Sequence, residues 1–378
     1  MTRFLKLGWP AGLIGVAVLL ASCASPSSAP TATQAPATAK PTVASAAAGA
    51  SSQAYQPTPL SPPVKISVGV LGSSSDGGIF IANDRGYFKD EGIDLDVQRF
   101  QSLVDMVAPL TGGQLQIAAG GLAASLYNAS DRGISLRIVA DKGQAPSAEW
   151  DFAALVIRKD LIDSGKVKDY KDLKGLTLVT SGRGNSPEVA LATALKKGGL
   201  ALADVNYTQM GFPDMVTALG SKGIDGGILI EPFVSRTVSE GTGVRWKGNV
   251  EIFGGNEQIA AIVYGEQFAM KPDVAQHWMN AYIRGVRDYN DAFGPKKKGF
   301  DDVVNLLVAQ TTVKDPKIFA QMKPAGLDPD GRLDLQSMKA DLAYYVESGQ
   351  TKTGTDLSKL IDTSFQEASV KALGPYTP

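Results

Sequence analysis

One stretch of the chain decides the fold: residues 82–95 read ANDRGYFKDEGIDL. A helix is predicted to end at Gly86, because glycine tolerates the left-handed backbone that follows many helices. The Tyr-Phe pair after it supplies apolar bulk to pack the turn. Gly92 then permits a second turn, which leads into a strand over 93–100. The stretch therefore predicts a helix, a turn and a strand in immediate succession.

Apolar segments of strand and helix character alternate on both sides of this stretch. Strands are predicted over 65–71, 93–100, 115–119, 136–140, 152–158, 176–180, 205–210 and 224–230. Helices are predicted over 79–85, 104–110, 189–197 and 215–219, and the tail over 271–373 is predicted to be mostly helical. Strands separated by helices are typical of α/β layers with parallel strands.

A short internal repeat divides the alternating region into two blocks. Residues 105–110 and 214–219 both follow the pattern DMVxxL, and an apolar residue follows the copies at 115 and 224. The offset between the copies is 109 residues throughout. A match this short can arise by chance, yet each copy lies in a helix that leads to the third strand of its block. The simplest interpretation is two βαβαβ blocks, and therefore a two-lobed α/β protein.

The N-terminus carries the features of a secretory signal. Arg3 and Lys6 flank the start of an apolar run of about 14 residues, which is shorter than the roughly 18 residues of a membrane span. Cys23, the only cysteine in the chain, follows Leu-Ala-Ser and resembles the lipobox cysteine of bacterial lipoproteins, which is acylated after cleavage. We predict that residues 1–22 are a signal peptide and that lipid on Cys23 anchors the chain to the bacterial membrane, outside the cytoplasm. The alternative is an ordinary signal peptide with an incidental cysteine.

The segment after the signal, residues 23–62, consists almost entirely of Ala, Ser, Thr, Pro and Gln. Its repeated prolines break helices, and its few large apolar side chains cannot offset the entropy lost on ordering. We therefore predict a disordered linker between the lipid and the folded part.

Composition excludes several classes of function. Lys and Arg number 37 against 38 Asp and Glu, which argues against a nucleic-acid partner. His277, predicted on a helix surface, is the only histidine, and no cysteine follows Cys23. Ser-His and Cys-His catalysis and zinc sites of His and Cys are therefore excluded. Gly182-x-Gly184 lacks the third glycine of a dinucleotide fingerprint. We predict that the protein is not an enzyme and holds no metal or cofactor, while a hydrolase built on two carboxylates stays open.

The opening stretch closely resembles the signature A-x-x-x-G-Y-F-x-x-E-G-[LI]-x-[VL] of periplasmic-type solute-binding proteins. The family that it resembles serves ABC importers for nitrate, alkanesulfonates, taurine, thiamine precursors and riboflavin. Further matches are GQLQIA at 113–118, VIRKD at 156–160 and LKGL at 173–176. The resemblance covers residues 64–293, and the helical tail agrees with it in character.

This resemblance implies a type II-like periplasmic binding protein fold, with two parallel-rich sheets flanked by helices and a two-segment hinge. Lobe one is predicted over 64–153 plus 257–378 and lobe two over 154–256, with crossings near 150–158 and 254–264. The resemblance also implies a ligand trapped in the cleft between the lobes. Closure would present the liganded shape to an ABC permease, and we expect the receptor to be a monomer.

Ligands of open parallel sheets bind beyond the carboxyl ends of the strands, close to helix N-termini. Four loops fit this position: 72–78, 119–121, 181–188, and 212–214 together with 231–233. From these loops and nearby aromatic positions, the predicted ligand-binding residues are Ser74, Ser75, Asp76, Phe80, Gly120, Gly121, Tyr127, Trp150, Ser181, Arg183, Asn185, Ser186, Phe212, Asp214 and Glu231. Helix capping competes with ligand contact at Asp76, Ser186 and Asp214.

The predicted site combines carboxylates with aromatic rings. Four carboxylates would repel an anion in a closed cleft, namely Asp76, Asp214, Glu231 and Glu257. Arg183 and free helix N-termini could instead bind an anion. Trp150 is the first candidate for stacking on a planar ring. We predict a vitamin-type aromatic heterocycle, riboflavin-like or a pyrimidine precursor, although the chain lacks the cysteine-rich run of the thiamine-precursor branch. The alternatives are a receptor for alkanesulfonate, taurine or nitrate, and a tethered sensor on the same fold.

Overall fold

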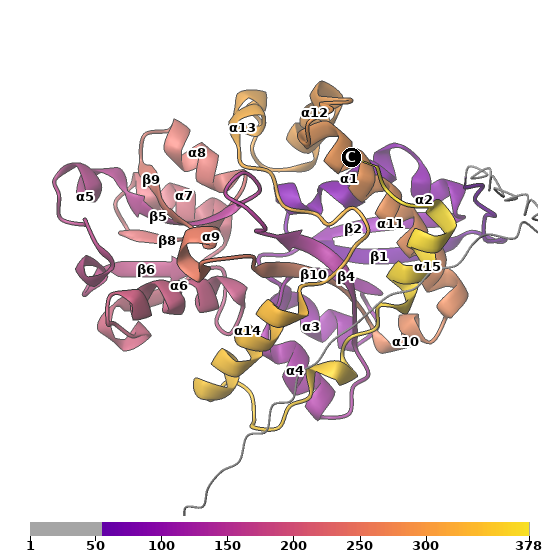
Figure 1. Ribbon diagram of the computed structural model, residues 1–378, viewed down its shortest axis with the longest axis horizontal. Coiled ribbons are helices and arrows are strands. Elements are labelled where there is room, and N and C mark those ends of the chain that lie inside the picture. The colour runs from indigo at the N-terminus through magenta and orange to yellow at the C-terminus, as the bar shows by residue number, and fades with distance from the viewer. Residues whose placement is uncertain (1–54, 378) are drawn as a thin grey trace, which may run out of the picture. The chain divides into compact units, whose positions relative to one another are not determined.

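A computed structural model describes residues 55–377, which form two lobes, each built around a five-stranded sheet (Figure 1). The first sheet contains β1 (Val64–Val70), β2 (Ile93–Arg99), β3 (Ile117–Gly121), β4 (Arg137–Gln144) and β10 (Gln258–Tyr264), in the order β2-β1-β3-β10-β4. The second contains β5 (Ala153–Arg158), β6 (Thr177–Thr180), β7 (Asn206–Gln209), β8 (Gly226–Ile230) and β9 (Gly243–Gly248), in the order β7-β6-β8-β5-β9. The predicted two-lobed α/β fold is confirmed.

Each sheet combines four mutually parallel strands with one antiparallel strand. β10 runs antiparallel to β3 and β4, and β5 runs antiparallel to β8 and β9. β5 follows a first connection, residues 145–152, and β10 follows a second connection, residues 254–257. The chain therefore passes between the two sheets twice. Each time, the first strand after the connection, β5 or β10, is an internal strand of the sheet that it joins.

Helices pack on both sheets (Figure 1). Those before the second connection are α1 (Gly77–Asp84), α2 (Tyr87–Asp90), α3 (Leu103–Thr111), α4 (Ala124–Asp131), α5 (Lys159–Asp163), α6 (Ser186–Lys197), α7 (Phe212–Gly220), α8 (Phe233–Ser239) and α9 (Asn249–Phe253). α10 (Glu266–Ala269) follows β10, and the predicted helical tail over 271–373 contains α11 (Pro272–Phe293), α12 (Phe300–Gln310), α13 (Pro316–Gln321), α14 (Leu335–Glu347) and α15 (Ser364–Leu373).

The internal repeat corresponds to equivalent elements of the two sheets. Helices α3 and α7 begin 109 residues apart, at Leu103 and Phe212, and both are nine residues long. Strands β3 and β8 begin at Ile117 and Gly226, with the same offset, and each holds the third place in its sheet. The repeat therefore marks the same helix–strand unit in both lobes.

Residues 82–95 form the predicted helix end and strand, but a short helix, α2, lies where a turn was predicted between them. Gly86 and Gly92 both adopt the left-handed backbone, with φ of 77° and 73°, and α2 lies between them. Phe88 of α2 packs against Trp278 at a ring distance of 5.6 Å. A Cβ at position 92 would overlap the backbone of Leu60, so this approach requires glycine.

The predicted surface role of His277 is wrong. Its Nδ1 lies 2.6 Å from Oε2 of Glu91, whose side chain is fully buried. Tyr55 donates its hydroxyl to the other oxygen of Glu91 at 2.6 Å. Residues 55–62, predicted as the end of the linker, thus contact the first lobe. The predicted signal peptide and lipidated Cys23 lie outside the described residues.

No helix within residues 55–377 is long and apolar enough to cross a membrane.

Helix α11 forms the centre of the first lobe and supports the loops at the sheet edge. Trp278 and Tyr282 stack at 5.2 Å, and Gly285 lies against the backbone of Gly78 in α1. Tyr282 also donates its hydroxyl to the carbonyl of Asp141 in β4, at 2.7 Å. α11 therefore fixes β4 and also α1, which follows the first of the predicted site loops.

Candidate functional site

The carboxyl ends of strands from both sheets meet around one small cavity, which we call the cleft cavity. Its lining residues are Leu71, Ser75, Ser102, Leu103, Gly121, Phe152, Ser181, Asn185, Pro187, Phe212, Ile230, Ile259 and Ala260. The cavity volume is about 20 Å³, room for roughly one water molecule. The two lobes are therefore closed on one another at the predicted position of the ligand.

Five of the predicted ligand-binding residues line this cavity: Ser75, Gly121, Ser181, Asn185 and Phe212. The prediction missed Ser102, the N-cap of α3, and Phe152, where the first connection enters β5. The signal for Ser102 was present, since a serine lies three residues before Asp105 at the start of a predicted helix. The wall of the cavity is mostly apolar, with hydroxyl and amide groups placed around it.

The loops after β3 and before α6 are hydrogen-bonded directly to each other. Ala124 N donates to the carbonyl of Gly184 at 2.8 Å, and Ser186 N donates to the carbonyl of Leu122 at 2.9 Å. The Ser186 hydroxyl donates to the carbonyl of Ile259 in β10 at 2.8 Å. The interpretation of Ser186 as a helix cap is wrong, because Asn185 is the N-cap and accepts from Glu188 N. Ser186 instead joins the two lobes.

A buried lysine that the sequence analysis did not single out supports the loop after β1. Lys142 Nζ lies 2.8 Å from Oδ1 of Asp76 and donates to the Ser75 hydroxyl at 2.8 Å. The other oxygen of Asp76 accepts from Ser73 N at 2.8 Å. Asp76 is thus paired with a cation and does not line the cleft cavity, whereas Ser75 does.

Glu231 is also held by its own lobe. Its carboxylate accepts from Ser235 N at 2.9 Å and from the Ser235 hydroxyl at 3.0 Å, and Arg245 Nη1 lies 3.8 Å away. Burial raises the pKa of Glu231 to about 7, although Ser235 and Arg245 oppose that rise. Its backbone carbonyl accepts from Ser74 N at 3.0 Å and so connects the second sheet to the loop after β1.

The remaining predicted residues lie away from the cleft cavity. Phe80 and Tyr127 are buried core residues, and Gly120 packs against Leu103 in the first lobe. Arg183 is exposed and lies over the ring of Tyr207 at 5.4 Å.

Trp150 borders a separate pocket of about 300 Å³, which the tail also lines. The structure therefore does not place it where it would stack on a ligand in the cleft cavity.

A larger pocket of about 560 Å³ adjoins the cleft cavity and shares Leu71 and Phe212 with it. Its other lining residues are Arg99, Phe100, Gln101, Asp105, Gly211, Pro213, Asp214 and Thr312. Asp214 is exposed there, in the first turn of α7. The pocket adds charged groups of both signs beside an uncharged cavity.

The helices that begin near the cleft cavity carry their own carboxylates. Asp76 precedes α1, and acidic residues in the first turn of α3, α6 and α7 are Asp105, Glu188 and Asp214. A carboxylate in the first turn offsets the positive end of the helix dipole. These N-termini are therefore less suited to binding an anion than free ones would be.

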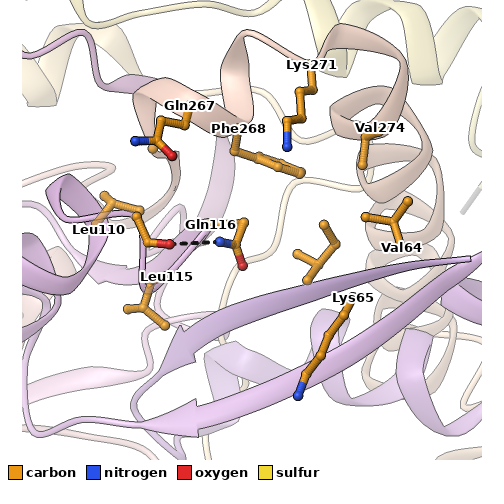
Figure 2. Close-up of a pocket in the computed structure, with 12 residues that line it drawn as sticks. Val64, Lys65, Leu110, Leu115, Gln116, Gln267, Phe268, Lys271 and Val274 are labelled. Atoms are coloured by element: carbon orange, nitrogen blue, oxygen red, sulfur yellow. Dashed lines mark hydrogen bonds between the residues drawn. The ribbon is translucent and has the colours of Figure 1, made fainter.

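A further pocket, of about 110 Å³, lies in the first lobe beside β1 and α10 (Figure 2). Gln116 holds its wall, donating to the carbonyl of Gly113 at 3.1 Å and accepting from Ser67 N at 2.8 Å. Figure 2 shows Lys271 directed toward the pocket and Lys65 directed away from it. None of the predicted ligand-binding residues lines this pocket.

No cluster of three or more His, Cys, Asp or Glu side chains within residues 55–377 could hold a metal ion.

Comparison with known proteins gives a family and a fold. The family model described as the NMT1-like family matches residues 60–298, and no curated protein matches the chain. A structure from Bordetella bronchiseptica is similar, with 23% identity and a TM-score of 0.68 over 82% of this chain and 97% of that one. The nitrate-binding protein NrtA from Synechocystis has 13% identity and a TM-score of 0.68, over 85% of this chain and 90% of that one. The alkanesulfonate-binding protein SsuA from Xanthomonas axonopodis, bound to MOPS, has 15% identity and a TM-score of 0.64, over 80% of this chain and 99% of that one.

Proposed function

Because this chain belongs to the NMT1-like family, we propose that it is an extracytoplasmic solute-binding receptor that delivers a small organic ligand to an ABC importer. The observation that carries the proposal is the cleft cavity, where loops at strand ends of both lobes converge. Two chain connections between the lobes allow a hinge motion that opens this cavity and closes it around a ligand. The permease would then recognise the closed shape.

The proposal also includes the membrane anchor and the oligomeric state. Lipid on Cys23 would hold the receptor at the membrane surface, with the linker giving it reach to the permease. The receptor would act as a monomer and would not be an enzyme, since its cavity offers hydroxyl and amide groups and no charged acid–base pair.

The charges around the cleft cavity favour an uncharged ligand. None of the residues that line it is charged, and the buried Lys142, which donates to the lining residue Ser75, is paired with Asp76. Arg245 is likewise paired with Asp151, at 3.2 Å. An anion would enter without a free cation to compensate its loss of hydration, which is costly in a closed site. A neutral ligand escapes this cost.

The aromatic side chains of the wall favour a planar ring. Phe152 and Phe212 both line the cavity, and Phe212 stacks on Phe233 at 5.8 Å, which fixes its orientation. Around them Ser75, Ser102 and Asn185 can exchange hydrogen bonds with ring substituents. We therefore favour a vitamin-type aromatic heterocycle, riboflavin-like or a pyrimidine precursor.

The second candidate is a receptor for nitrate, alkanesulfonate or taurine. The names of two structural neighbours support it, and Arg99 in the adjoining pocket supplies a cation for such a ligand. Arg99 donates to the carbonyl of Gln310 at 2.6 Å, and Asp105 and Asp214 line the same pocket. Those carboxylates would repel an anion, which weakens the second candidate. A competition experiment separates the two candidate ligand classes.

The test is native mass spectrometry with an absorbance spectrum of the full chain, followed by a thermal-shift panel. The panel sets riboflavin and pyrimidines against nitrate, taurine and alkanesulfonates. We expect a heterocycle to raise the melting temperature, and Phe212→Ala and Asn185→Ala to abolish that rise. Arg183→Ala, exposed in the neighbouring loop, is the matched control and should leave it unchanged. Stabilisation by an anion alone would establish the second candidate, and a rise that survives both cavity variants would place the site elsewhere.

A further inference from the structure

The three serines that line the cleft cavity differ in the hydrogen bonds that their hydroxyl groups can still form. Ser75 and Ser102 follow β1 and β2, which are neighbouring strands of the first sheet, and Ser181 follows β6 of the second sheet. A hydroxyl group has one proton to donate and two lone pairs that accept. Where a neighbouring group already takes the proton, the oxygen can only accept a hydrogen bond from a ligand.

The proton of Ser102 is held by a carboxylate. The Ser102 hydroxyl donates to Oδ2 of Asp105 at 2.9 Å, and the backbone N–H of Ser102 donates to the same oxygen at 3.1 Å. Both bonds belong to the start of α3. Because an ionised carboxylate is a stronger acceptor than a neutral group, the proton stays with Asp105. Ser102 therefore offers the cavity its lone pairs and acts there as an acceptor.

The proton of Ser75 is committed through a chain that ends at Asp76. Lys142 donates to the Ser75 hydroxyl at 2.8 Å and has no acceptor of its own, so this bond uses one lone pair of Ser75. The Ser73 hydroxyl oxygen lies 3.0 Å from that of Ser75 and 3.1 Å from Oδ2 of Asp76. The carboxylate of Asp76, paired with Lys142, is the stronger acceptor, so Ser73 gives it its single proton. Ser75 then supplies the proton of the bond to Ser73 and keeps one lone pair for the cavity.

The wall of the second lobe has the opposite polarity. Oδ1 of Asn185 accepts from Glu188 N at 3.3 Å, which directs the Nδ2 group of the same amide toward Ser181. This Nδ2 group donates to the Ser181 hydroxyl at 3.2 Å. Within residues 55–377, Ser181 Oγ accepts this hydrogen bond and donates none. The hydroxyl proton of Ser181 is therefore available to a ligand.

These assignments do not depend on closure of the lobes. The hydrogen-bond partners of Ser75 and Ser102 lie in the first lobe, and the partner of Ser181 lies in the second. A cavity of about 20 Å³ must open to admit a ring, and each wall keeps its own hydrogen bonds when the lobes separate. A ligand therefore meets two acceptors on one side and a donor on the other.

We infer that the receptor selects a ligand with N–H or O–H donors directed to Ser75 and Ser102 and an acceptor atom directed to Ser181. This inference rests on the proposed function and narrows its ligand class. Pyrimidine and flavin-type rings that carry an N–H group beside a carbonyl group meet both requirements. Rings with fully alkylated nitrogens, and nitrate or sulfonate groups, present acceptors to both walls. The lone pairs of Ser75 and Ser102 would then be buried without a donor.

The test compares two isomers as ligands of the full chain. 5,6-Dimethyluracil and 1,3-dimethyluracil have the same formula and the same two carbonyl groups, but only the first keeps its N–H groups. Titration calorimetry gives the dissociation constant of each. We expect the N–H isomer to bind about tenfold more tightly, because only it can donate to the first lobe. Riboflavin and 3-methylriboflavin, which lacks the imide N–H, form a second pair with a larger ring system.

Serine variants identify the groups responsible. Ser75→Ala and Ser102→Ala should each weaken binding of the N–H isomer by about three- to tenfold and leave the alkylated isomer unchanged. Ser181→Ala should weaken both isomers, because both keep their carbonyl groups. Ser239→Ala, exposed at the end of α8, is the control and should change neither. A loss of folded protein would reduce the binding of both isomers equally, so the ratio of their dissociation constants stays informative in each variant.

The outcomes separate this inference from the proposed function. Equal or tighter binding of the alkylated member of a pair would overturn the inference, and so would a preference for the N–H member that persists in both Ser75→Ala and Ser102→Ala. If Phe212→Ala still abolishes binding in those cases, the proposed function stands. If no member of either pair binds, the proposed heterocycle receptor fails and this inference fails with it.

Discussion

Lys142 Nζ lies 2.8 Å from Oδ1 of Asp76, and both side chains are completely buried. The pair connects β4 to the loop after β1, and the same ammonium group donates to Ser75 in the wall of the cleft cavity. A charged pair at this depth is stable only while both partners are present, because either charge alone would be uncompensated.

Removing one partner of this pair should destabilise the protein strongly. We expect Lys142→Met to lower the free energy of unfolding by about 3–5 kcal/mol, measured by urea denaturation, since Asp76 loses its cation. The double variant Lys142→Met with Asp76→Asn should regain a large part of that loss. If the single variant were as stable as the parent chain, the pair would not support the fold.

Glu231 should make the protein less stable as pH rises. Burial raises its pKa to about 7, so the folded protein holds a proton that the unfolded chain releases near the usual glutamate value. The free energy of unfolding should therefore fall between about pH 4.5 and pH 7, by at most roughly 3 kcal/mol from this group. Glu231→Gln should reduce that slope in denaturation curves recorded across the range. An unchanged slope would assign the effect to other groups, such as Asp141.

The contact between α1 and α11 should not tolerate a methyl group. A Cβ at position 285 would overlap the carbonyl of Gly78 and approach Ala82. We expect Gly285→Ala to cost about 1–3 kcal/mol of unfolding free energy, because both helices must move apart. Gly255→Ala, in the second connection, has open space around the new methyl group and is the matched control. Equal stabilities for the two variants would contradict the described packing.

The charge of the ligand should appear in the salt dependence of binding. A neutral heterocycle in the cleft cavity should bind with nearly the same Kd from about 50 mM to about 500 mM salt. A nitrate or sulfonate near Arg99 should bind more weakly as salt rises. Titration calorimetry at the two salt concentrations separates these cases, and Arg99→Gln should remove the salt dependence only in the second.

The repeat shows how far local sequence determines this fold. Residues 105–110 and 214–219 lie in equivalent helices because the same pattern of apolar residues packs against the equivalent strand in both lobes, although Ser102 caps α3 and α7 follows Gly211 without a side-chain cap. The antiparallel placement of β5 and β10 was not predicted. It depends on which sheet the chain enters after each connection, a long-range choice that strand patterns do not encode.

The site was predictable as a set of loops but less so as a set of side chains. Ser75 and Asn185 lie in loops beyond the carboxyl ends of strands, where open parallel sheets bind their ligands. Tyr127 and Trp150 also follow from sequence as aromatic candidates, but packing against the tail decides where their rings lie. Lys142 was missed because its partner Asp76 is far away in sequence, and a lysine in a strand carries no local sign of burial.

The place of β10 has a consequence for synthesis of the chain. β10 fills the position between β3 and β4, yet it follows every strand of the second sheet in the sequence. A nascent chain emerging from the ribosome can assemble the second sheet before the first is complete, since domains fold as their residues become available. The lobe that begins first is thus finished last, and a chain stopped before Gln258 would leave β3 and β4 as two open edges in an incomplete sheet.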